Sequence, residues 1–142
     1  MTPLPRPGVV LFAEDLQLVT IFYEEVAGLS IVRADSDHIV LACEGLELII
    51  HAMPEALAGT LHIEVPPEPR DEAAIKLSLP VTSLAAARSR AAKHGGAVGA
   101  EDAEWEGEGF RACDGHDPEG NVVQFREPAS VAGDDAAGSR TS

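Results

Sequence analysis

The stretch "DPEGNVVQF", residues 117 to 125, decides the fold that we expect for this chain. Asp117, Pro118 and Gly120 are typical of turns: Asp bonds to nearby backbone, Pro presets its own φ, and Gly accepts a positive φ. The alternating apolar residues that follow the turn are typical of a short, half-buried strand. We therefore expect a tight turn that leads into the last strand of the domain.

Upstream of this turn, the chain repeats one order of elements twice. Each copy has a strand, a helix opened by a capping Asp15 or Ser83, and three further short strands. Superposing the copies matches Val9 with Leu77, the starts of the first strands. The sequence therefore predicts an α+β fold built from two βαβββ modules.

The pattern also predicts the boundaries of the domain. We expect a single domain over residues 1–130, with module one at 8–52, a Pro-rich connection at 53–71 and module two at 72–127. Residues 131–142 are small and polar, and they are expected to form a disordered tail. A chain of 142 residues is long enough for one core and too short for two.

Composition excludes several classes of function. A net charge of −14 argues against nucleic acid and anionic membranes as partners, because both require clustered Lys and Arg. No apolar run approaches the roughly 20 residues that span a bilayer. Cys43 and Cys113 lie far apart, outside any CxxC motif and without a signal peptide before them, so we expect a cytoplasmic protein with reduced cysteines.

The segments "AEDLQLVTIFYEEVAGL" (13 to 29) and "DPEGNVVQF" (117 to 125), set in two βαβββ modules, resemble the vicinal oxygen chelate superfamily. This superfamily includes glyoxalase I, bleomycin-resistance proteins and extradiol dioxygenases, and the resemblance covers roughly residues 8 to 127. It implies that the two modules form a curved mixed sheet around a concave pocket. It also implies that this pocket is usually completed in a homodimer.

In metal-dependent relatives, four inward side chains hold one divalent cation, and the resemblance places these positions at Gly8, Glu47, Lys76 and Gln124. Gly8 has no donor side chain, and the Lys76 ammonium would repel a cation. We therefore expect no resident metal or other cofactor. An ion pair between Lys76 and Glu47, bridged by the Gln124 amide, is expected to replace the metal.

Because the metal-ligand positions are largely lost, the favoured function is reversible binding or sequestration of a small organic molecule, cationic or aromatic. The single tryptophan lies among acids in "EDAEWEGEGF", residues 101 to 110, where two interpretations stay open: it stacks on such a ligand, or it caps the sheet beside a solvated acidic loop. Burial and stacking with a few polar anchors would hold such a ligand. The expected ligand-binding residues are Phe12, Glu47, His51, Lys76, Trp105, Phe110 and Gln124.

Two enzymatic alternatives stay open, and the sequence does not establish a catalytic residue. The first is a divalent-metal-dependent lyase, isomerase or dioxygenase of the same superfamily. It would hold Mn, Fe, Ni, Co or Zn through the metal-ligand set Glu47, His51, His62 and Gln124. The second is a metal-free enzyme in which Lys76 or Glu47 acts as a base with a shifted pKa.

Overall fold

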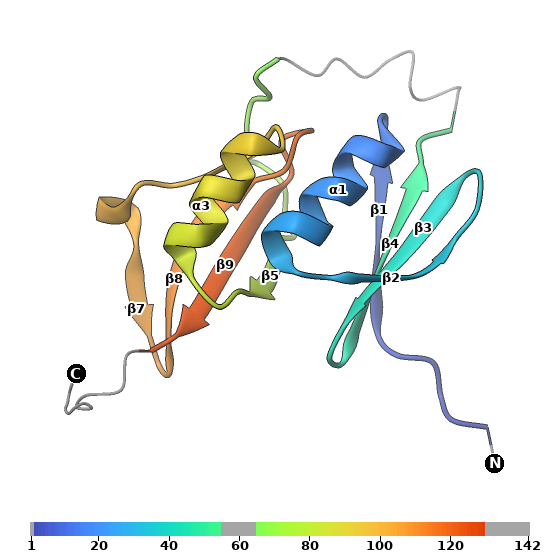
Figure 1. The fold of residues 1–142 in the computed structure, drawn as a ribbon, viewed down its shortest axis with the longest axis horizontal. Helices are drawn as coiled ribbons and strands as arrows, with labels where there is room; N and C mark the ends of the chain where they lie inside the picture. Colours follow the sequence, from blue (N-terminus) through green and yellow to red (C-terminus); the bar gives the residue numbers. More distant parts are fainter. Residues whose placement is uncertain (1, 55–64, 130–142) are drawn as a thin grey trace.

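The computed structural model describes residues 2–54 and 65–129, so His62 and the expected tail at 131–142 lie outside the described residues. Two groups of elements follow one another along the chain (Figure 1). The first group is β1 (Gly8–Ala13), α1 (Leu16–Ala27), β2 (Ser30–Ala34), β3 (His38–Cys43) and β4 (Leu46–Ala52). The second is β5 (Leu77–Pro80), α3 (Leu84–Lys93), β6 (Ala97–Val98), η1 (Glu101–Ala103), β7 (Trp105–Gly107), β8 (Phe110–His116) and β9 (Val122–Pro128).

Each group forms its own mixed sheet. Sheet A has the strand order β1-β4-β3-β2, and sheet B has the order β5-β9-β8-β6 with β7 also paired to β8. In both sheets the first strand runs parallel to the last, β1 with β4 and β5 with β9, and the other pairs are antiparallel. The predicted α+β fold of two βαβββ modules is therefore confirmed. β7 is an addition, formed by part of the segment around Trp105.

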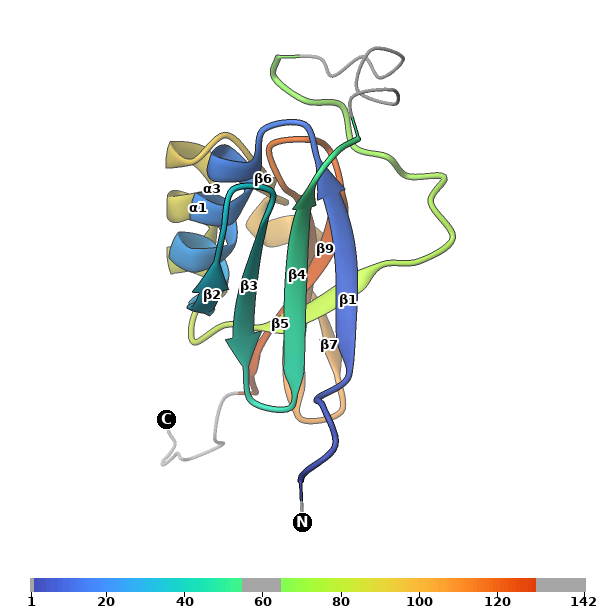
Figure 2. The same ribbon diagram turned by 90° about the vertical axis from the view of Figure 1, so that its right-hand side faces the viewer.

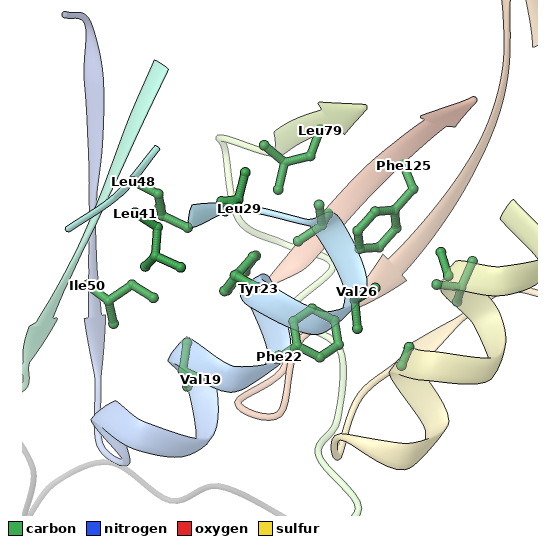
Figure 3. Close-up of a cluster of buried hydrophobic side chains, with 14 of the residues drawn as sticks. Val19, Phe22, Tyr23, Val26, Leu29, Leu41, Leu48, Ile50, Leu79 and Phe125 are labelled. Carbon is green, nitrogen blue, oxygen red and sulfur yellow. The ribbon is translucent and has the colours of Figure 1, made fainter. Parts of the chain in front are cut away.

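Helix α1 begins and ends at the residues that the sequence indicates. The Asp15 side chain accepts a hydrogen bond from the Leu18 amide at 3.1 Å, and Gly28 ends the helix with a φ of 71°. In Figure 3, α1 side chains lie between Leu48 of sheet A and Phe125 of sheet B. One continuous apolar core therefore joins the two modules through α1. No helix in the described part of the chain is long and apolar enough to cross a membrane.

The turn at residues 117–121 fastens the second module to α1. Asp117 is fully buried, and its carboxylate accepts hydrogen bonds from the Tyr23 hydroxyl at 2.8 Å and from the amides of Glu119 and Asn121 at 2.8 and 3.0 Å. The Asn121 side-chain amide donates a fourth at 2.9 Å. Buried carboxylates require this full set of donors. The most specific sequence motif of the chain is therefore a structural clamp.

Glu119 adds a second link from the same turn. Its buried carboxylate accepts hydrogen bonds from the Glu14 amide at 2.9 Å and the Asp15 amide at 2.7 Å, just before α1. Burial raises the pKa of Glu119, although the two backbone donors oppose that shift. The two modules are thus joined by polar contacts at the start of α1 as well as by the apolar core.

Helices α1 and α3 pack on one side of the sheets, so each sheet has an outer face that turns away from these two helices. Outer face A consists of Gly8, Val10 and Phe12 of β1 with Glu47, Ile49 and His51 of β4, as strand alternation requires. In Figure 2 this face of sheet A points toward the viewer, and no described helix or strand lies over it. Outer face B consists of Ser78, Phe110, Ala112, Asp114, Gln124 and Arg126, with Trp105 beside them on β7.

Candidate functional site

Outer face A brings together three of the seven residues expected to bind ligand. β1 and β4 pair in parallel so that Phe12 lies beside His51, and the two ring centroids are 5.7 Å apart. The His51 Nδ1 donates to the Ala52 carbonyl at 2.8 Å, and Nε2 has no hydrogen-bond partner among residues 2–54 and 65–129. Glu47 lies four residues before His51 on the same face of β4. The arrangement offers an aromatic surface with an imidazole and a carboxylate at its side.

Outer face B carries a network of polar side chains around Gln124. The Ser78 hydroxyl donates to Gln124 Oε1 at 3.1 Å, and Arg126 Nε donates to the same oxygen at 2.7 Å. Asp114, the cross-strand neighbour of Gln124, pairs with Lys76 Nζ at 2.8 Å. Because two donors occupy Oε1, the amide NH₂ is the part of Gln124 that a ligand would meet.

The expected ion pair between Lys76 and Glu47 is wrong, because Lys76 pairs with Asp114 instead. Lys76 lies just before β5, and the residue beside Gln124 in the register is Ser78, as Gly8 is beside Glu47 in sheet A. Relative to Glu47 and Gln124, the first-strand position of the second copy is therefore two residues later than the superposition placed it. Such a shift keeps the side chain on the same face of the sheet, which is why alternation alone did not reveal the error.

Trp105 and Phe110 form an aromatic pair beside this network. Their ring centroids lie 5.7 Å apart with the rings at 76°, an edge-to-face contact, and the Arg126 guanidinium carbon lies 4.4 Å from the centre of the Phe110 ring. Trp105 remains 44% exposed. Its ring therefore packs on Phe110 and still presents a surface to a ligand.

The seven expected residues thus fall on two faces of two sheets. Phe110 lines two of four cavities in the described part of the chain, and the other six expected residues line none of these four. That all seven side chains line one ligand pocket stays a prediction.

The side chains at the four positions that hold the cation in metal-dependent proteins of the resembled superfamily do not fit a catalytic divalent cation. Gly8 supplies no donor, and Ser78 takes the place beside Gln124 that the resemblance gave to Lys76. The oxygen of Gln124 already accepts two hydrogen bonds, which leaves the Glu47 carboxylate as the one strong oxygen donor of this set. Such cations require about three imidazole or carboxylate ligands.

A different group of ligand-type side chains, which sequence reasoning missed, lies at the turn between β2 and β3. The His38 Nδ1 is 2.9 Å from both Asp35 Oδ1 and Asp37 Oδ1. Asp35 also accepts from the amides of Asp37 and His38, so its carboxylate organises the turn. The hydrogen bond to Asp37 raises the pKa of His38. His38 in turn stacks on His51, with ring centroids 5.9 Å apart, and so supports outer face A.

A second charged cluster lies on the helix side of sheet B. Glu104 bridges Arg88 and Arg111 with contacts of 2.6 Å to each, and these arginines lower the pKa of Glu104. Nearby Cys113 is fully buried, and burial raises the pKa of its thiol. The buried thiol and the Glu104 ion pairs are therefore assigned to the stability of the fold.

Residues 8–125 match a family model described as a glyoxalase-like domain. The match spans both modules, from β1 of the first to β9 of the second. In each module the first strand pairs in parallel with the last strand. The chain therefore belongs to the glyoxalase-like domain family, within the vicinal oxygen chelate superfamily. A search of curated proteins gave no match.

Solved structures of this superfamily share the fold. A glyoxalase/bleomycin resistance protein/dioxygenase family enzyme from Burkholderia phytofirmans PsJN is 18% identical, with a TM-score of 0.63 over 86% of this chain and 97% of that one. A glyoxalase-related enzyme from Fulvimarina pelagi is 19% identical, with a TM-score of 0.62 over 85% and 86%. The antibiotic binding protein TnmS3 from Streptomyces sp. CB03234 is 18% identical, with a TM-score of 0.58 over 91% and 99%. At these identities the likeness establishes the fold.

Proposed function

We propose that this protein binds a small organic molecule, cationic or aromatic, and does so without a resident metal. The observation that carries the proposal is outer face A, where half-exposed aromatic and aliphatic side chains surround a carboxylate and an imidazole. Phe12 is 50% exposed and Val10 is 55% exposed, although both residues lie on β1, which is paired with β4 along its whole length. Exposed apolar surface of this kind, bordered by polar groups, is typical of binding sites.

Charge favours a cationic aromatic ligand on outer face A. Glu47 and His51 lie on the same face as the Phe12 ring, so a flat ligand stacked on Phe12 would place a positive group near the Glu47 carboxylate. The net charge of −14 adds a field that attracts cations. TnmS3, which has the same fold, is described as an antibiotic binding protein, so this fold accommodates ligand binding in at least that case.

The proposal includes a homodimer that completes the pocket. Outer face A has an aromatic surface but few donors, whereas outer face B carries Gln124, the Lys76–Asp114 pair and Trp105. A second copy that lays its outer face B over outer face A would unite all seven residues, twice, in a two-fold dimer. The cytoplasm is the proposed location of this dimer.

Trp105, the single tryptophan, offers a direct test. Benzylamine is the cationic aromatic probe, benzyl alcohol is its neutral counterpart, and tryptophan emission measures binding of each. We expect benzylamine to bind more tightly, and Phe12→Ala to weaken it by about tenfold through the loss of stacking and apolar area. Leu18→Ala is the matched control, because Leu18 is 41% exposed on α1, outside both faces.

Two results would refute this function. One is equal affinity of benzylamine for the Phe12→Ala variant and the parent protein. The other is ligand binding that appears after a divalent cation is added and disappears with a chelator. The molar mass in solution, measured by light scattering after size-exclusion chromatography, tests the dimer separately. The mass of a monomer at micromolar concentration would contradict the dimer.

A further inference from the structure

A groove of about 700 Å³ lies where α1 ends, α3 begins and β9 ends, and it shares Phe110 and Arg126 with outer face B. Its volume is in the range of pockets that hold small organic molecules. Most of its wall is apolar, and its polar residues include two arginines and one glutamate. The apolar wall consists of Val26, Ala27, Pro80, Val81, Ala87 and Pro128.

The charged groups of this groove differ from those of the rest of the chain. The protein has 24 acidic residues and 10 Lys and Arg residues, yet Arg90 and Arg126 both line the groove. Within residues 2–54 and 65–129, neither arginine forms an ion pair, whereas Arg88 and Arg111 both pair with Glu104. The groove is therefore a locally positive site on an acidic protein.

The carboxylate of Glu127, which also lines the groove, is already engaged. Its Oε1 accepts a hydrogen bond from the Leu84 amide at 2.6 Å, at the first turn of α3. The Ser83 hydroxyl accepts from the amide of Ala86 at 3.0 Å. Two amides at the start of α3 are thus capped by side chains, and the guanidinium groups of Arg90 and Arg126 are the positively charged donors of the groove. Arg126 already uses its Nε to donate to Gln124, which leaves its two terminal nitrogens for a ligand.

We propose that this groove is a second binding site, for an organic anion with an apolar body, such as an arylalkanoate. The carboxylate would pair with the guanidinium groups of Arg90 and Arg126, and arginine is well suited to carboxylates because its donors form a planar fork. The apolar body would lie on the aliphatic wall and on Phe110, whose ring Arg126 already covers. A cationic ligand is disfavoured, because it would meet two arginines.

This site is separate from the one proposed above. Phe12, Glu47 and His51 do not line the groove, and the preferred ligands have opposite charge. Phe110 and Arg126 also belong to outer face B, where Phe110 forms an edge-to-face pair with Trp105 and its ring faces Arg126. Variants of Arg90 test the groove alone, because Arg90 lies on α3, away from both outer faces.

Isothermal titration with three probes of one shape tests the inference: phenylbutyrate, phenylbutanol and phenylbutylamine. We expect phenylbutyrate to bind, and the neutral and cationic probes to bind at least about tenfold more weakly. Arg90→Gln should weaken phenylbutyrate by about tenfold, and Arg90→Gln with Arg126→Gln should abolish its binding. The matched control Arg33→Gln removes one exposed positive charge from β2 and should leave the affinity unchanged.

Phe12→Ala should also leave the affinity for phenylbutyrate unchanged, because Phe12 does not line the groove. The test of the groove is therefore independent of the function proposed for outer face A. Arg90 is exposed and has no ion pair among the described residues, so Arg90→Gln is expected to fold; its melting curve checks this. The inference is overturned if phenylbutanol binds as well as phenylbutyrate, if Arg90→Gln has the parent affinity, or if phenylbutyrate shows no binding at millimolar concentration.

Discussion

Replacing Tyr23 by Phe tests the clamp between the modules. The change removes one hydroxyl, whose oxygen lies 2.8 Å from Asp117 Oδ2 in a fully buried contact between residues 94 positions apart. The ring itself remains packed edge-to-face on Phe22, with centroids 5.2 Å apart. Asp117 keeps its three other donors, so the variant isolates a single hydrogen bond.

The expected loss is about 2 kcal/mol of unfolding free energy, since hydrogen bonds to a charged group contribute roughly 1.5 to 3 kcal/mol. For a domain of this size, this corresponds to a fall in melting temperature of about 6 to 10 °C. Burial, together with the neighbouring Asp117, raises the pKa of Tyr23 well above its usual value. The folded state therefore retains a proton that the unfolded state releases at about pH 10, and the advantage of the parent protein should shrink as the pH rises above that value.

Urea unfolding followed by far-ultraviolet circular dichroism measures this difference at neutral pH and above pH 10. Thr20→Val is the matched control, because it removes another buried hydroxyl of α1, one that donates to a neutral carbonyl, that of Leu16, at 2.7 Å. Its cost should be about 1 kcal/mol. A Tyr23→Phe variant within about 0.5 kcal/mol of the parent, or one no more costly than Thr20→Val, would show that the clamp does not act as described.

Three further substitutions, the last of them a control, test local features by the same unfolding assay. Glu104→Gln should cost about 1 to 2 kcal/mol, because it breaks two charge-assisted contacts of a nearly buried carboxylate. The pKa of Glu104 is lowered in the folded state, so the parent protein should lose this stabilisation as the pH falls below the usual range of glutamate pKa values. The Glu104→Gln variant should show no such loss. Parallel curves of unfolding free energy against pH for the two proteins would contradict this expectation. Gly120→Ala should cost about 2 to 3 kcal/mol, because its φ is 85° and the new Cβ would lie 2.3 Å from the Glu68 carbonyl oxygen. Gly45→Ala, with a φ of 83° and open space, should cost about 1 kcal/mol, and equal costs at the two sites would refute the steric argument.

The element order was predictable because capping and turn residues act locally. Asp15, Ser83 and Gly28 end or begin their helices where the sequence indicates. β7 was missed because the acidic residues around Trp105 are typical of a solvated loop. The strand forms because Trp105 and Gly107 pair with β8, and no local pattern encodes that long-range pairing.

The candidate site was less predictable, because side-chain partners depend on register and on tertiary contacts. Placing Lys76 opposite Glu47 relied on a repeat of slight identity, and a shift of two residues is invisible to alternation. The partner of Lys76, Asp114, lies on a strand that follows it by 38 positions. The roles of Asp117 and Glu119 as buried acceptors were likewise hidden, since a turn motif does not say which groups it will bury.

The central claim, a binding site that needs no metal, is tested most directly by elemental analysis of protein purified without chelator. Thermal melting of the same samples with Mn, Fe, Ni, Co and Zn completes the measurement, with Glu47→Gln as the matched variant. The account predicts metal far below one equivalent and no rise in melting temperature that depends on Glu47. Near-stoichiometric metal, with a melting temperature raised by the same cation in the parent and not in Glu47→Gln, would contradict it and favour the metal-dependent enzymes of this superfamily.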